Sequence, residues 1–83
     1  MWRIFLSPDV CAFLKKQDKH IGLRLRNGLE KLKTDNIFHY LEHFEGHDFY
    51  KYRVGDYRAL IDVDFQNKIL MVRILDKMGR VYK

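Results

Sequence analysis

The sequence predicts an α+β domain with the element order β-α-α-β-β-β. In this arrangement, two N-terminal helices pack on one face of a mainly antiparallel four-stranded sheet. Two observations predict it: apolar residues recur at helical spacing before residue 33, and from Phe49 onward the period changes to two. With 83 residues, of which 47% are hydrophobic, the chain is expected to form one domain over 1–83.

The first elements are a strand and a capped helix. Trp2–Leu6 is rich in aromatic and branched residues, which favours a strand. Ser7 can cap the free N–H groups of a following helix, and Pro8 has the backbone angle that the first helical position needs. This short helix is expected to present an apolar stripe of Val10, Phe13 and Leu14.

A second helix is marked by a stripe that comprises Ile21, Leu25, Leu29 and Leu32. Its basic residues, including Arg24 and Arg26, lie mostly off the stripe. Gly22 and Gly28 should each weaken this helix by roughly 1 kcal/mol relative to alanine.

Three strand-like runs complete the chain: Phe49–Val54, Tyr57–Asp64 and Lys68–Leu75. Gly55-Asp56 and Gln66-Asn67 separate them, and both pairs are short enough for hairpin turns. The runs should therefore form a meander that the first strand joins. One sheet face would then be covered by helices and the other would remain open to solvent or a ligand.

The charge favours a polyanionic partner. Sixteen Lys and Arg against eleven Asp and Glu give a net charge of +5, which points first to nucleic acid. The single cysteine, Cys11, excludes an internal disulfide and suggests a reducing compartment, so a cytoplasmic location is expected. Its place beside the first apolar stripe predicts a buried, inert thiol. No apolar run is long enough to span a bilayer, so no membrane partner is expected.

The turn at Gly55-Asp56 predicts a group of cations. A two-residue loop would place Arg53 opposite Arg58 and Lys51 opposite Leu60, so that the three cations share one face. Asp62, further along that face, could partly neutralise them. We interpret the group as an anion site, the alternative being a solvated sheet face.

Such a group could cleave RNA without a metal or another cofactor. The 2′-hydroxyl of RNA adjoins the phosphate, so an enzyme has to align it for in-line attack and stabilise the charge that develops on phosphorus. Lys and Arg can do this, although the pattern is not unique to ribonucleases.

The segment 50–61, Tyr-Lys-Tyr-Arg-Val-Gly-Asp-Tyr-Arg-Ala-Leu-Ile, resembles the central motif of the RelE/ParE toxin superfamily, as does Phe44-Glu45-Gly46 before it. Residues 79–83 resemble the closing segment of that superfamily. The chain is similar in particular to compact archaeal RelE toxins. The resemblance implies the RelE-like fold and a toxin paired with a RelB-like antitoxin. It also implies a metal-independent endoribonuclease that cuts mRNA in the ribosomal A site.

The resemblance also assigns roles by position. The implied catalytic residues are Lys51, Arg53, Arg58, Arg80 and Tyr82. Lys51 would bind RNA or transfer a proton, Arg58 would stabilise the transition state, and Tyr82 would stack on a base or donate a proton. The RNA-binding residues are predicted to be Lys51, Arg53, Arg24, Arg26 and Lys77, with the two arginines of the second helix gripping ribosomal RNA.

One position departs from the RelE pattern. RelE-type enzymes usually carry an arginine just before the closing glycine, where this chain has Met78. A thioether cannot donate a hydrogen bond to an oxyanion, so the activity could be reduced or absent. The alternative is a ParE-like toxin that inhibits DNA gyrase by binding.

A metal site is a weaker hypothesis. His39, His43 and His47 fall at i, i+4 and i+8, which would align three imidazoles on a helix. Gly46 interrupts that segment, and a polar connector with solvent-facing histidines is the favoured interpretation, so no metal is expected.

Overall fold

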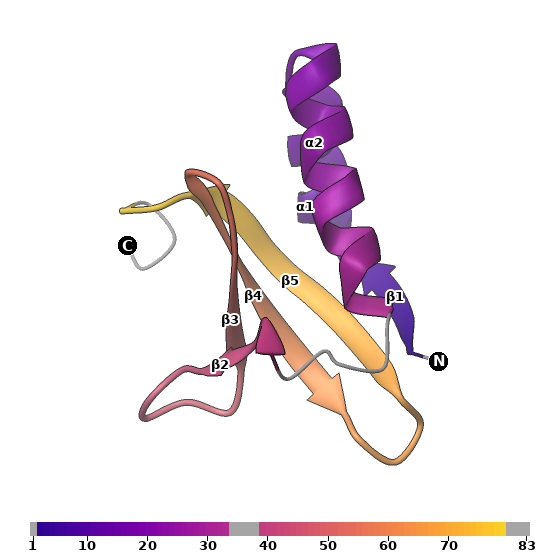
Figure 1. Ribbon diagram of the computed structural model, residues 1–83, viewed down its shortest axis with the longest axis vertical. Coiled ribbons are helices and arrows are strands. Elements are labelled where there is room, and N and C mark those ends of the chain that lie inside the picture. Colours follow the sequence, from indigo (N-terminus) through magenta and orange to yellow (C-terminus); the bar gives the residue numbers. More distant parts are fainter. Residues whose placement is uncertain (1, 34–38, 80–83) are drawn as a thin grey trace.

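The computed structural model describes residues 2–33 and 39–79. The elements, in chain order, are β1 (Arg3–Leu6), α1 (Pro8–Lys16), α2 (Lys19–Glu30), the 3-10 turn η1 (Lys31–Lys33), β2 (Glu42–His43), β3 (Tyr50–Val54), β4 (Tyr57–Asp64) and β5 (Ile69–Lys77). The strands form one sheet in the order β1-β5-β4-β3-β2. β1 runs parallel to β5, whereas the other neighbours are antiparallel (Figure 1).

The predicted fold class is confirmed, but the predicted strand count of four is wrong, because the sheet has five strands. The additional strand, β2, has only two residues, which is too short for a period-two pattern to appear in the sequence. It exists because the chain returning from the helices pairs with β3, with Glu42 opposite Lys51.

Helix α1 begins as the sequence predicts. The Ser7 hydroxyl oxygen accepts a hydrogen bond from the Val10 backbone N–H at 3.2 Å, and Pro8 occupies the first turn. The Ser7 hydroxyl also donates to the Arg73 carbonyl at 2.8 Å, which attaches the helix start to β5. The predicted burial of Cys11 is wrong: Cys11 is exposed, since it follows buried Val10 by one residue and therefore points about 100° away from it.

Helix α2 lies unusually close to β3. The Tyr52 hydroxyl donates to the Gly28 carbonyl at 2.6 Å, and a Cβ on Gly28 would lie 2.7 Å from Cγ1 of Val54. Burial of the Tyr52 side chain, and to a lesser extent the nearby Tyr40, raises the pKa of Tyr52 above its usual 10.0. Gly28 thus weakens the helix locally but permits this close packing.

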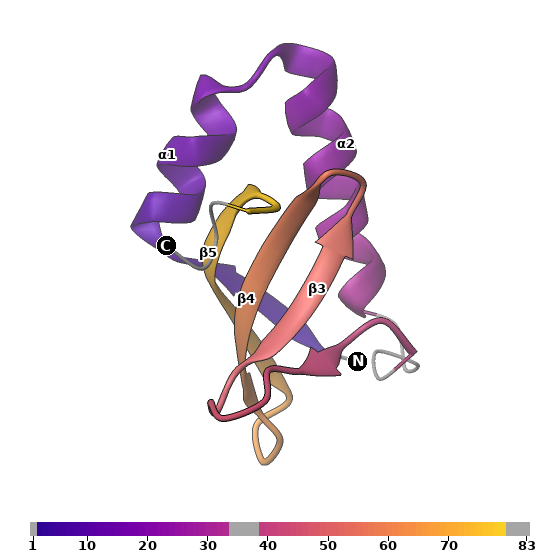
Figure 2. The same ribbon diagram turned by 90° about the vertical axis from the view of Figure 1, so that its left-hand side faces the viewer.

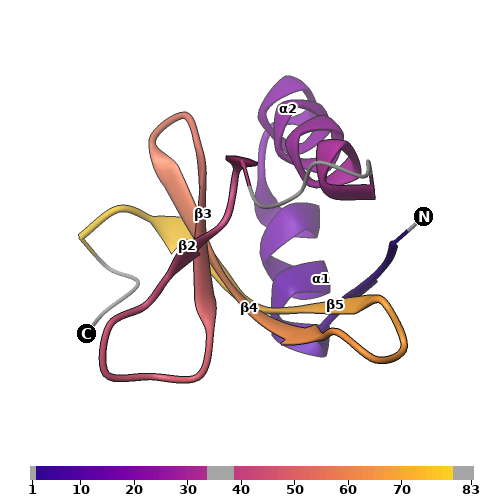
Figure 3. The same ribbon diagram turned by 60° about the horizontal axis from the view of Figure 1, so that its bottom comes forward.

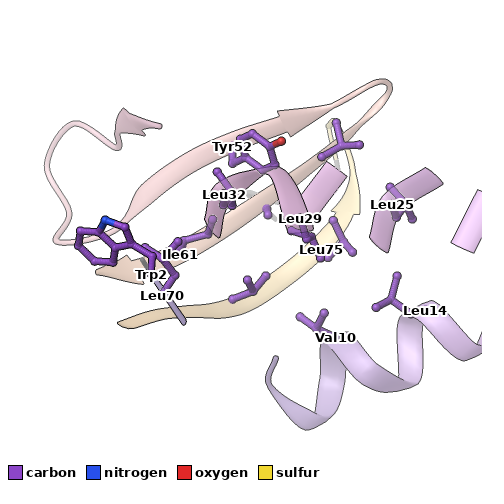
Figure 4. Packing of buried hydrophobic residues seen from close by; sticks show 13 residues of the cluster. Trp2, Val10, Leu14, Leu25, Leu29, Leu32, Tyr52, Ile61, Leu70 and Leu75 are labelled. Atoms are coloured by element: carbon purple, nitrogen blue, oxygen red, sulfur yellow. The ribbon is translucent and has the colours of Figure 1, made fainter. Parts of the chain in front are cut away.

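Both helices form a hairpin on one face of the sheet (Figures 2 and 3). The core between them and the sheet is shown in Figure 4; among its buried residues are Val10, Leu14, Leu25, Leu29, Tyr52, Ile61, Leu70 and Leu75. The helices leave the opposite side of the sheet uncovered. We call that side the outer face; on β3 and β4 it carries Lys51, Arg53, Arg58, Leu60 and Asp62.

Within the described part of the chain, neither helix has the length and apolar character needed to cross a membrane.

Candidate functional site

The β3–β4 hairpin places three cations on the outer face. Arg53 is paired with Arg58 and Lys51 with Leu60, so the predicted register is confirmed. Tyr52, between the two cations of β3, is buried in the core, and alternation therefore directs Lys51 and Arg53 outward. We call Lys51, Arg53 and Arg58 the cation group.

Lys51 has an acidic and an aromatic neighbour. Its Nζ lies 3.6 Å from Oε1 of Glu42, the residue opposite it on β2. The same Nζ lies 5.4 Å from the centroid of the Phe44 ring. The Lys51 side chain is 24% exposed and that of Glu42 is 74% exposed, so water screens the ion pair and it contributes little stability.

The two arginines are held by the turn and the neighbouring strand. Nε of Arg53 donates to the Gly55 carbonyl at 3.1 Å. Gly55 has a φ of +57°, a conformation that glycine adopts without strain in such turns. Arg58 is half-buried and lies opposite Asp76 of β5 in the register.

Asp62 does not neutralise the cation group, so that prediction is wrong. Its carboxylate instead accepts a hydrogen bond from Nε of Arg73. The reason is a bulge between β4 and β5: Leu60 pairs with Ile74 and Ile61 with Val72, which leaves Arg73 as an extra residue beside Asp62.

A shallow depression of about 360 Å³ adjoins the cation group at the end of β5. It is lined by Arg53, Asp56, Lys77 and Met78. The Met78 backbone N–H donates to the Asp56 carbonyl at 2.9 Å, which holds this end of β5 against the β3–β4 turn (Figure 1). Position 78 therefore lies beside Arg53, and a basic residue there would extend the cation group.

Arg24 and Arg26 lie in different places. Arg24 lines an open groove of about 460 Å³ between α2 and the β3–β4 turn, together with Gly55 and Lys31. Arg26 lines hollows on another side of α2, one of which contains Ile4. Two residues along a helix correspond to a rotation of about 200°, so only Arg24 adjoins the turn that carries Arg53.

Arg80 and Tyr82 lie outside the described residues, so their predicted roles stay predictions. The histidines do not form the hypothetical helical row, because His43 belongs to β2 and His47 to the loop after it. Within 2–33 and 39–79, no three His, Cys, Asp or Glu side chains are arranged to hold a metal ion.

Sequence reasoning missed a cluster of rings next to Lys51. Phe44, His47 and Phe49, in the β2–β3 loop, contact one another, with centroid separations of 4.7 Å for Phe44–His47, 5.2 Å for His47–Phe49 and 5.8 Å for Phe44–Phe49. We call these three residues the aromatic cluster. The sequence feature that could have revealed this cluster is the density of rings around Gly46, directly before the strand that carries Lys51 and Arg53.

No family model and no curated protein matches the sequence. Solved structures do match it over nearly its full length. The archaeal RelE–RelB complex from Pyrococcus horikoshii matches with 24% identity and a TM-score of 0.75, covering 95% of this chain and 97% of that chain. The RelB–RelE antitoxin–toxin complex from Methanococcus jannaschii matches with 23% identity and a TM-score of 0.70, covering 94% of each chain.

The isolated E. coli RelE toxin is also similar, with 16% identity and a TM-score of 0.72 over 99% of this chain and 92% of that chain. These likenesses show that the chain has the RelE fold, as its resemblance to RelE sequences implies.

Proposed function

We propose that this chain is the toxin of a type II toxin–antitoxin system and acts in the cytoplasm as a RelE-like, ribosome-dependent mRNA interferase. The observation that carries the proposal is the cation group. Three cations lie on the uncovered side of a RelE-type sheet, and two of them face each other across the hairpin. Such a surface can hold a phosphodiester and the charge that grows on it.

The proposed reaction takes place in the ribosomal A site and needs no metal. The 2′-oxygen of the mRNA attacks the adjacent phosphorus, forming the O2′–P bond while the P–O5′ bond breaks. The 2′-hydroxyl loses its proton to a base, and the departing O5′ receives one, which leaves a 2′,3′-cyclic phosphate and a 5′-hydroxyl. Lys51 and Tyr82 are the proposed proton-transfer groups.

The other residues would supply positive charge and contacts to RNA. Arg58, with Arg53 opposite it, would stabilise the dianionic phosphorane-like transition state, and Arg80 would add to this charge. Lys77 would contact the RNA backbone from the depression beside Arg53. Arg24 and Arg26 would bind phosphates of ribosomal RNA, and such contacts weaken steeply as salt concentration rises.

The proposed partner is a RelB-like antitoxin. The similar structures include complexes of RelE with RelB, and this chain leaves a basic outer face that a partner with acidic residues would fit. Covering the cation group would keep RNA away from it.

Met78 favours a second candidate, a ParE-like toxin that binds and inhibits DNA gyrase. The Met78 side chain, 40% exposed, contributes no charge to the depression beside Arg53. A surface that lacks a cation at position 78 can still bind a partner, even when its positive charge is too small to catalyse cleavage. Supercoiling by purified gyrase tests this candidate, and unchanged supercoiling at micromolar protein counts against it.

The decisive experiment for the ribonuclease is cleavage of mRNA on programmed ribosomes, with the 5′ ends mapped. We expect cuts within the A-site codon. Arg58→Ala should reduce the rate by about 10²–10³-fold through the loss of one transition-state contact.

The matched control is Arg3→Ala, because Arg3 is an exposed arginine on β1, on the far side of β5 from β4. It should cleave at the parental rate, and circular dichroism should show all three proteins folded. Equal rates for the parent and Arg58→Ala would remove Arg58 from the mechanism. No cleavage by the parent would contradict the ribonuclease.

A further inference from the structure

Two backbone hydrogen bonds stabilise the loop before β3, which carries the aromatic cluster. The Phe44 backbone N–H donates to the Phe49 carbonyl at 2.9 Å, and the His47 N–H donates to the Phe44 carbonyl at 3.0 Å. Gly46 permits the turn between them with a φ of +83°. The loop projects from the sheet edge on the side away from the helices (Figure 3).

The aromatic cluster does not serve the core. Phe44 and Phe49 lie outside the hydrophobic core cluster of the described residues, and His47 is exposed. The His47 and Phe49 rings are stacked with an interplanar angle of 11°, and Phe44 meets His47 edge-on at 86°. A partly exposed group of rings in mutual contact is a surface on which a flat π-system can stack.

Lys51, which the proposed function assigns to RNA binding, adjoins this surface, since its Nζ lies 5.4 Å from the Phe44 centroid. Proteins that bind single-stranded nucleic acid combine these two elements, a cation for the backbone and rings for the bases. In a nucleotide the base and its phosphate are separated by one sugar, so a strand whose phosphate meets Lys51 has a base within reach of the cluster.

We propose that Phe44, His47 and Phe49 form a stacking platform for one base of the RNA strand whose phosphate Lys51 holds. The proposal rests on the proposed function for the identity of the strand. It adds a residue set that determines where the strand lies, and therefore which nucleotide reaches the cation group. Stacking accepts every base, with purines favoured by their larger ring area.

The test is direct binding of a single-stranded RNA pentamer with 2-aminopurine at its centre, at low ionic strength. The fluorescence of this base falls when it stacks. The parent should quench it, and Phe49→Leu and His47→Ala should bind about 5- to 150-fold more weakly, as expected for the loss of one stacked base.

Phe5→Leu is the matched control. Phe5 is 45% exposed and has a cation above its ring, with Cζ of Arg3 at 5.9 Å, but it lies on β1 at the opposite edge of the sheet. It should bind as the parent does. Amide NMR spectra should show that both loop variants keep the fold. If Phe49→Leu unfolds, His47→Ala still tests the platform, because it retains both phenylalanines.

The platform would be overturned by the absence of quenching with the parent, by equal RNA affinity of the parent and the loop variants, or by equal weakening in Phe5→Leu. Loss of antitoxin binding with unchanged RNA binding would likewise overturn it, marking a protein-docking loop. Ribosomal cleavage is a separate readout. If the parent binds the pentamer through the loop but does not cleave mRNA, the ribonuclease proposal is contradicted and the stacking platform is supported.

Discussion

Arg53 and Arg58 lie directly opposite each other across the β3–β4 hairpin. Like charges in one cross-strand pair are unfavourable, by up to about 1 kcal/mol. Arg53 is held by the Gly55 carbonyl, and Arg58 faces Asp76 on the next strand. A bound phosphate would offset the repulsion between the two guanidinium groups, which links this arrangement to the proposed activity.

Replacing Met78 by arginine should raise the rate of mRNA cleavage, by up to about 10²–10³-fold if the added donor reaches the scissile phosphate. Position 78 shares a depression with Arg53 and Lys77, so a guanidinium there would join the cation group. Met78→Leu is the control, since it adds no donor. The measurement is the rate of mRNA cleavage on programmed ribosomes. Identical rates for the two variants would show that position 78 does not reach the reacting phosphate.

Removing the Glu42 carboxylate should strengthen RNA binding. Oε1 of Glu42 lies 3.6 Å from Nζ of Lys51 and would compete with a phosphate for this ammonium group. Because exposed ion pairs contribute about 0.2–1 kcal/mol, Glu42→Gln should tighten binding by about 1.4- to 5-fold at low salt. Lys51→Ala should weaken it. Fluorescence titration at two salt concentrations measures both, and the Glu42 effect should shrink as salt rises.

Gly28→Ala should destabilise the fold by about 1–3 kcal/mol despite its better helix propensity, because the new methyl would lie 2.7 Å from the stiff Val54 side chain. Gly22→Ala is the matched control. Its Cβ would meet only the Leu14 carbonyl oxygen at an ordinary 3.5 Å, so it should gain roughly 1 kcal/mol from propensity. Urea unfolding measures both, and adding Val54→Ala should rescue Gly28→Ala.

Alkaline pH should weaken the packing of α2 on β3. The pKa of Tyr52 is raised by burial, so the folded state holds the phenolic proton more tightly than the unfolded chain, whose value is near 10.0. This contribution is therefore complete below pH 10 and is lost as pH rises through the folded pKa. Tyr52→Phe should cost about 1 kcal/mol at neutral pH, through the hydrogen bond to Gly28.

The corresponding measurement is the free energy of unfolding between pH 8 and 11. The parent should lose stability above pH 10 more steeply than Tyr52→Phe does. Parallel curves for the two proteins would mean that Tyr52 does not titrate differently in the folded state.

Much of the site could be predicted from local pattern. The two-residue loop at Gly55-Asp56 determines the hairpin register, and the alternation of side chains then places Lys51 with Arg53 and Arg58 on one face. The link between Asp62 and Arg73 could not be foreseen, because it depends on a bulge between β4 and β5. The aromatic cluster was missed because rings in a loop follow no period.

The order of the elements other than β2, the Ser7 cap, the meander and the cation group all follow from the sequence alone. These features depend on residues a few positions apart, whose spacing directly reflects helix or strand geometry. The tertiary structure decided that β1 joins β5, that β2 adds a fifth strand, and that Arg24 rather than Arg26 adjoins the hairpin turn. It also brought Gly28 against Tyr52 and Val54. Such contacts join segments far apart in the chain, and their choice depends on how the whole set of apolar faces packs together.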